Sequence, residues 1–133
     1  MGAWGIGIFE NDDASDWLYT LVEEEGVDAL RPTLMAAADL FGITEEMLEE
    51  PAGSEALAAA EVVAALLGKT SLNLPEQVLE WVQGKEFGPE LAFVALKAVK
   101  VVLTNSELKE LWEESDYFNA WMSIVNSLRE RLT

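Results

Sequence analysis

The stretch that decides the fold runs from Ala56 to Leu67 and reads ALAAAEVVAALL. Eleven of its twelve residues are apolar, and the exception is Glu61. A helix that is apolar on every side is normally buried in the middle of a bundle. Pro51, Ala52 and Gly53 are expected to interrupt helical structure, and Ser54 after them is a good N-cap. Gly68 is expected to end the helix. The sequence therefore predicts a central helix over residues 55–67.

Helical spacing continues on both sides of this central stretch. Apolar residues recur every three or four positions between residues 14 and 41 and again between 75 and 132, and no segment alternates convincingly like a strand. Glycine and proline separate these segments into short units. The expected N-caps of the first helix and of the last two are, in chain order, one of residues 11–13, Ser106 and Asp116.

These segments predict an all-α fold. We expect an irregular or orthogonal bundle of six to seven helices with a glycine-rich N-terminal arm, forming a single helical domain over residues 1–133. Half of the residues are apolar and five are tryptophan, which is enough material for a sizeable core. A small solenoid of stacked helix pairs is the alternative, although the sequence contains no visible internal repeat.

The chain contains neither cysteine nor histidine. The missing cysteines exclude disulfides, thiolate metal sites and thiol nucleophiles. The missing histidines exclude every catalytic triad built on imidazole and remove a common zinc ligand. An enzyme is therefore less expected than a binding protein, and no cofactor is expected.

The chain is strongly acidic, with 25 acidic and 8 basic residues and a formal net charge of −17. Residues 1–51 carry 13 acidic residues and only Arg31, a net charge of −12. Such a charge repels nucleic acid backbones and anionic lipid surfaces, so neither is an expected partner. The N-terminus lacks a secretory signal pattern, and the longest apolar stretch is too short to cross a membrane. We expect a cytoplasmic protein.

Residues 1–17 form the most distinctive string of the chain, MGAWGIGIFENDDASDW. Its three glycines, at positions 2, 5 and 7, do not have the spacing of a dinucleotide-binding loop, and no strand precedes them. We therefore expect the glycines to let the arm bend tightly, while Trp4 and Phe9 insert into the bundle.

This string resembles the N-terminal signature of a bacterial family of small domains of unknown function, whose members begin MGAWGxGxFxNDxAxDW. The resemblance extends along the chain through residues 56–68 and 74–81 and implies a full-length member. It also implies a bacterial, cytoplasmic protein. It transfers no activity, cofactor or site residue.

Two sets of carboxylates could form a metal site. Asp12, Asp13 and Asp16 provide oxygen ligands at the start of a helix, and a hard cation such as Mg²⁺ or Mn²⁺ prefers oxygen. Glu61 could join them if it were partly buried, because burial raises the pKa of a carboxyl group and favours a general base or a metal ligand. The alternatives are a helix cap among the aspartates and, for Glu61, pairing with a cation or an indole N–H.

Three functions remain open, and the one that the sequence supports best comes first. The first is a non-enzymatic interaction protein, for example of the inhibitor or immunity type, that docks on a basic protein partner. The second is a hydrolase or phosphoryl-transfer enzyme that uses Mg²⁺ or Mn²⁺ and carboxylates alone. The third is a homo-oligomerising structural domain; the oligomeric state is open. The candidate interaction residues are the glutamates of two acidic runs, which otherwise form a solvated surface: Glu23, Glu24, Glu25, Glu45, Glu46, Glu49 and Glu50.

Overall fold

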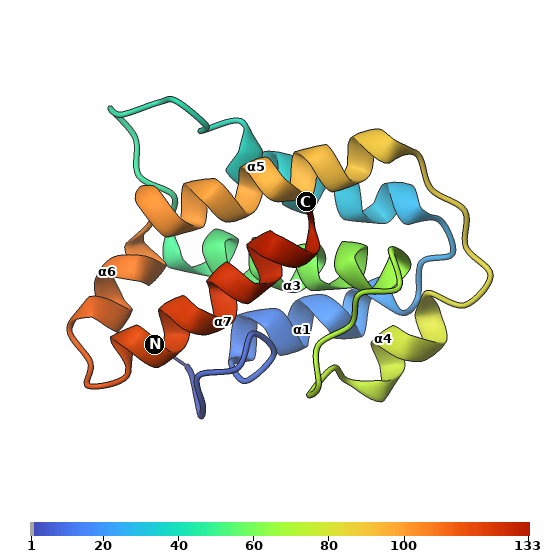
Figure 1. The fold of residues 1–133 in the computed structure, drawn as a ribbon, viewed down its shortest axis with the longest axis horizontal. Coiled ribbons are helices and arrows are strands. Elements are labelled where there is room, and N and C mark those ends of the chain that lie inside the picture. Colours follow the sequence, from blue (N-terminus) through green and yellow to red (C-terminus); the bar gives the residue numbers. More distant parts are fainter. Residues whose placement is uncertain (1) are drawn as a thin grey trace.

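The computed structural model describes residues 2–133, and these residues form seven α-helices and no strand (Figure 1). The predicted all-α fold is therefore confirmed. A short 3-10 helix, η1 (Val27–Leu30), leads into the second α-helix. The α-helices are α1 (Asp12–Leu21), α2 (Arg31–Ala38), α3 (Glu50–Leu66), α4 (Glu76–Trp81), α5 (Pro89–Thr104), α6 (Glu107–Glu113) and α7 (Phe118–Arg131).

Helix α3 is the centre of the bundle, as its composition predicts. Twelve of its seventeen residues are buried. In Figure 1 it runs between α5 and α1, with α7 in front, and it contacts each of these helices and also α2 and α6. The small side chains of its alanine-rich face let several helices approach one axis closely. The hydrophobic core is therefore arranged around α3.

The start of α3 differs from the prediction of a break at residues 51–53. The helix begins at Glu50, and Pro51 lies in its first turn, where the missing proline N–H costs no hydrogen bond. Ser54, which was expected to be the N-cap, is buried inside the helix and donates to Glu50 Oε2 at 3.1 Å. The backbone N–H of Glu50 instead donates to Glu107 Oε1 at 2.7 Å. A side chain of α6 thus provides the hydrogen-bond acceptor for a backbone N–H group in the first turn of α3.

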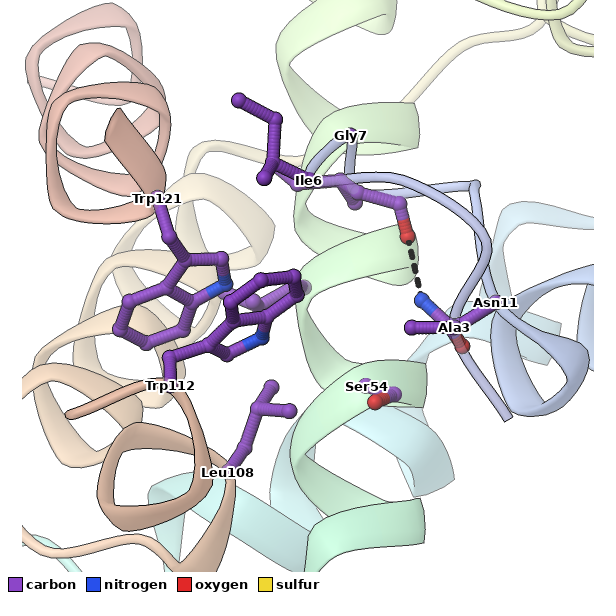
Figure 2. Close-up of a pocket in the computed structure, with 10 residues that line it drawn as sticks. Ala3, Ile6, Gly7, Asn11, Ser54, Leu108, Trp112 and Trp121 are labelled. Carbon is purple, nitrogen blue, oxygen red and sulfur yellow. Dashed lines mark hydrogen bonds between the residues drawn. The ribbon is translucent and has the colours of Figure 1, made fainter. Parts of the chain in front are cut away.

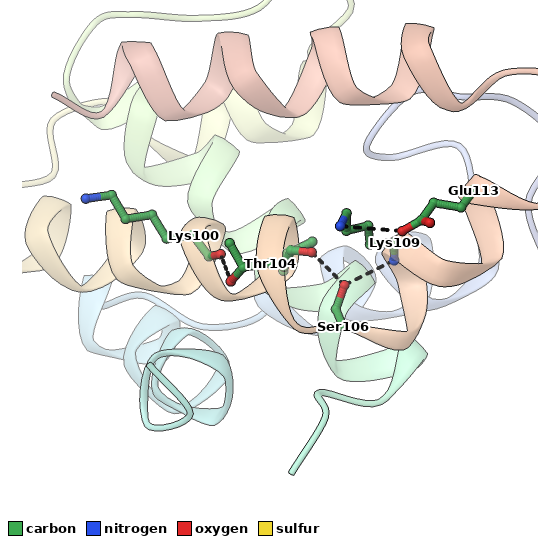
Figure 3. Close-up of polar contacts among 6 residues, drawn as sticks. Lys100, Thr104, Ser106, Lys109 and Glu113 are labelled. Carbon is green, nitrogen blue, oxygen red and sulfur yellow. Dashed lines mark hydrogen bonds and ion pairs between the residues drawn. The ribbon is translucent and has the colours of Figure 1, made fainter. Parts of the chain in front are cut away.

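Of the other three predicted N-caps, two are confirmed and one is wrong. Asn11 caps α1 by accepting from the Ala14 backbone N–H at 2.9 Å. Ser106 caps α6 by accepting from the Lys109 N–H at 3.1 Å, and its hydroxyl donates to Val102 O of α5 at 2.6 Å (Figure 3). Asp116 is not a cap, because α7 begins only at Phe118 and the residue before it makes no side-chain cap bond.

The glycine-rich arm folds back on itself and joins the first turn of α1. Trp4 N donates to Glu10 O at 3.0 Å, and Gly7 N donates to Glu10 Oε1, also at 3.0 Å. Gly5 and Gly7 lie against the Glu10 carboxylate; a Cβ atom added to Gly5 would come within 2.5 Å of Glu10 Oε2. These glycines therefore leave room for a carboxylate, and neither has a positive φ.

The arm buries one of its two aromatic side chains. Phe9 is partly buried against the core, as expected, and its neighbour Ile8 is buried. Trp4 does not insert into the bundle, because its side chain is 61% exposed. Ala3 packs against the core, whereas the side chain of Trp4 faces the solvent.

Candidate functional site

Glu61 is bonded to Arg131, which lies seventy residues later in the chain. The Glu61 side chain is 3% exposed, and Arg131 Nη1 and Nη2 donate to its Oε1 and Oε2 at 2.6 and 3.1 Å. Nη1 also donates to Lys69 O at 3.1 Å. Such a bidentate contact holds both planar groups in a fixed orientation. Pairing with a cation, one of the alternatives drawn from the sequence, is therefore the observed state of Glu61.

The Glu61–Arg131 pair lines an open groove of about 820 Å³. Three segments form its walls: residues 7–10 of the arm, residues 70–73 after α3, and one side of α7. This volume is within the range of small-molecule sites, roughly 300–1,000 Å³. Five of the thirteen lining residues have uncharged polar side chains: Thr70, Ser71, Asn73, Ser123 and Ser127. We call this cavity the hydroxyl groove.

A second cavity lies beneath the arm and is too small for a ligand. It measures about 10 Å³, which is room for roughly one water molecule. Figure 2 shows Trp112 and Trp121 beside it, and their rings are stacked with centroids 6.2 Å apart. Asn11 Nδ2 closes the arm next to it by donating to Ile8 O at 3.2 Å. This cavity is a packing gap between the arm and the α6–α7 corner.

The candidate metal ligands do not form a common site. Asp12 and Asp13 lie in the first turn of α1, with Asp16 one turn further along, and Glu61 is engaged by Arg131. Among residues 2–133, no three acidic side chains are grouped so that they could hold a metal ion. The structure therefore does not bring the three aspartates and Glu61 together as the carboxylate-only enzyme hypothesis requires.

Asp13 instead lies near two glutamates at the start of α3. Burial raises the pKa of the Glu50 carboxyl group, and the Asp13 carboxylate beside it raises this pKa further. The pKa of Glu55 is raised by burial and then by the charge of Asp13. Glu50 was expected to be solvated, yet it is half-buried because α3 begins one turn earlier than predicted. The sequence shows the acidic residues but not this contact between α1 and α3.

The rest of the second acidic run lies on an exposed loop beside exposed apolar side chains. Glu45, Glu46 and Glu49 are exposed, and Ile43 and Met47 of the same loop are 40% and 42% exposed. Two phenylalanines, Phe41 before the loop and Phe93 on α5, are 48% and 61% exposed. Lys97 joins them, with its Nζ atom 5.7 Å from the Phe41 ring centroid and 4.9 Å from that of Phe93. We call these apolar residues and the three glutamates the acid–aromatic face: Phe41, Ile43, Glu45, Glu46, Met47, Glu49 and Phe93.

This loop is held from both sides by the corner between α5 and α6. Asn105 Nδ2 donates to Ile43 O at 3.1 Å and to Glu46 O at 2.6 Å. Leu48 is buried, its N–H donates to Asn105 O at 3.1 Å, and its carbonyl accepts from Glu107 N at 2.8 Å. The acidic loop, which has no helix of its own, therefore has a fixed backbone path.

The first acidic run lies elsewhere. Glu23, Glu24 and Glu25 follow α1 and are exposed, and Trp81 Nε1 donates to Glu24 O at 2.7 Å. In Figure 1 this segment leaves α1 on the right, whereas residues 42–49 form the loop at the upper left. The two acidic runs therefore do not combine into one surface.

Comparison with known protein families gives a match over most of the chain. A family described as a domain of unknown function, DUF4259, matches residues 2–123. The chain belongs to the DUF4259 family. The predicted membership in a family of unknown function is thereby confirmed. Comparisons with curated proteins and with solved structures returned no match.

The DUF4259 match includes the arm, the acid–aromatic face and Glu61, but it ends within α7. Ser127 and Arg131, which complete the hydroxyl groove, lie beyond its last residue. Within residues 2–133 of this DUF4259 chain, no helix has both the length and the apolar character to cross a membrane.

Proposed function

We propose that this DUF4259 protein is a non-enzymatic interaction protein that docks on a basic protein through the acid–aromatic face. The observation that carries the proposal is that one segment exposes Phe41, Ile43 and Met47 together with three carboxylates, and that Lys97 connects Phe41 to the exposed Phe93. Aromatic and methionine side chains are enriched where protein partners meet, whereas rim charges select the partner and speed its approach.

The charge of the chain supports a basic partner. The net charge is −17, and residues 1–51, which include most of the face, contribute −12. Opposite charge on a partner would raise its association rate, and added salt would lower that rate. A partner of the inhibited-toxin or nucleic-acid-binding class has the required basic surface. A cytoplasmic location belongs to the same proposal.

The fixed backbone of the loop also supports docking. Binding costs free energy when a flexible segment must become ordered. Because Asn105 and the Leu48 backbone already hold the loop, less of this cost remains for complex formation. Glu61, one of the side chains that would serve an enzyme, is paired with Arg131.

The experiment measures binding to the basic proteins encoded next to the gene, by calorimetry at about 50 mM and about 300 mM salt. We expect one of them to bind, with weaker affinity at the higher salt concentration. The double substitution Phe41→Ala and Phe93→Ala should abolish the complex. The matched charge control, Glu23→Gln with Glu24→Gln, should leave most of the affinity. A complex that is insensitive to the Phe41 and Phe93 substitutions, or no complex at all, would contradict the proposal.

A further inference from the structure

The hydroxyl groove contains polar side chains that the fold itself does not use. Thr70, Ser71 and Asn73 lie on one wall, and Ser123 and Ser127 are one helical turn apart on the other. Within residues 2–133, none of these five side chains makes a hydrogen bond to the protein. The serines Ser54, Ser106 and Ser115, which lie outside the groove, all do. The groove therefore presents free donors and acceptors on two facing walls.

The charges in and around the groove oppose an anionic ligand. The carboxylate of Glu61 is neutralised by Arg131, and the Glu10 carboxylate accepts the Gly7 backbone N–H. The net charge of −17 opposes an anion, and no group of acidic side chains within residues 2–133 is suited to a metal ion. Arg131 uses three N–H groups in its hydrogen bonds. A guanidinium has five, so two remain to bind a ligand oxygen.

The shape and lining of the groove do not suit a peptide. Peptides usually bind at a sheet edge, in an apolar helix-binding groove, in an aromatic-lined proline site or at an arginine cluster. The described residues contain no sheet, and the groove has one arginine, already paired. Its four apolar side chains, Ile8, Phe9, Leu72 and Ile124, lie among the polar ones and do not form a continuous apolar strip. They can contact the C–H faces of a sugar ring.

We propose that the hydroxyl groove binds a short neutral oligosaccharide. Its hydroxyl groups bond to the free side chains of residues 70–73, to those of α7 and to the remaining N–H groups of Arg131. The volume of about 820 Å³ accommodates a ligand of this size. The site is separate from the acid–aromatic face, so either proposal can fail without the other.

The test begins with an array of neutral, sialylated and sulfated oligosaccharides, and the bound sugars are then titrated into ¹⁵N-labelled protein. We expect binding to neutral sugars, with saturable NMR shifts at residues 70–73 and 123–127. Ser127→Trp should abolish binding by filling the groove, whereas Ser15→Trp, at an exposed position of α1, should leave it unchanged. Thermal unfolding of both variants checks that they fold.

A milder variant keeps the proposal testable if the tryptophan disturbs α7. Ser123→Ala with Ser127→Ala removes two hydroxyls and should weaken binding by about threefold to tenfold for each hydrogen bond lost. The proposal is overturned if no neutral sugar binds at about 10 mM, if only the charged sugars bind, or if binding survives both α7 variants.

Discussion

Arg131, at the end of α7, binds both carboxylate oxygens of Glu61, the only charged residue in the buried middle of α3. The pair joins two helices that are far apart in sequence, and Glu61 is almost completely buried. Breaking a buried ion pair leaves one uncompensated charge, whereas replacing both partners by apolar side chains does not. The last turn of the final helix is thus tied to the centre of the core.

Removing the arginine alone should therefore destabilise the fold strongly. We expect Arg131→Ala to lower the free energy of unfolding by about 3–5 kcal/mol. The double substitution Glu61→Leu with Arg131→Leu should recover most of this loss, because no buried charge remains. Urea denaturation measures both values. A loss below about 1 kcal/mol for Arg131→Ala would show that water compensates Glu61.

Two tryptophans should differ in how much stability is lost when each is replaced by alanine. Trp121 is 2% exposed and stacks on Trp112, so Trp121→Ala should cost about 3–5 kcal/mol. Trp4 is 61% exposed, so Trp4→Ala should change stability by less than about 0.5 kcal/mol. Thermal unfolding distinguishes them. Comparable losses for the two variants would mean that Trp4 is packed in solution.

The hydroxyl of Ser106 connects α5 to α6. It caps α6 and donates to Val102 O (Figure 3), and the side chain is buried. Ser106→Ala should cost about 1–2 kcal/mol, mainly through the lost cap. The control is Thr104→Ala, because the Thr104 hydroxyl donates only to Lys100 O of its own helix and the residue is exposed. Denaturant unfolding should show a clearly smaller loss for the control.

The carboxylates around Asp13 should make stability depend on pH. The pKa values of Glu50 and Glu55 are raised above the ordinary 4.5 in the folded protein, first by burial and then by Asp13. Between 4.5 and the raised values the folded state binds more protons than the unfolded chain, so the contribution of these groups to stability falls as pH rises through this window.

Glu55→Gln should remove part of this loss. At pH 7 the variant should be more stable than the wild type, by less than about 1 kcal/mol because water screens the partly exposed groups. The difference should vanish below pH 4.5. The control Glu86→Gln changes the same charge on an exposed loop and should show no such pH dependence. Unfolding measured across this pH range would refute the prediction if the two variants behaved alike.

The sequence predicts those features that depend on neighbouring residues. The apolar composition of residues 56–67 identifies the central helix, and Asn11 and Ser106 act as the expected caps. The errors arise where distant residues decide. The side chain of Glu107, fifty-seven residues away, accepts a hydrogen bond from a backbone N–H group in the first turn of α3. The helix therefore extends back past the position expected for its cap.

The candidate sites show the same division between local and distant contacts. The acidic run at residues 45–49 is visible in the sequence, but the approach of Phe41 and Phe93 to the same lysine, Lys97, depends on how α5 packs in the fold. The hydroxyl groove combines three segments that no sequence spacing connects. For Glu61 the sequence indicates a need for a partner, and only the fold identifies that partner as Arg131.

The bonds from Asn105 to the acidic loop have a consequence for how this protein can change over generations. They run to the backbone carbonyls of Ile43 and Glu46 and do not involve the side chains of those residues. Substitutions at the exposed positions can therefore alter what the loop presents without altering its path. The corner between α5 and α6 can therefore preserve the path of this loop and the fold while the exposed side chains of the loop change.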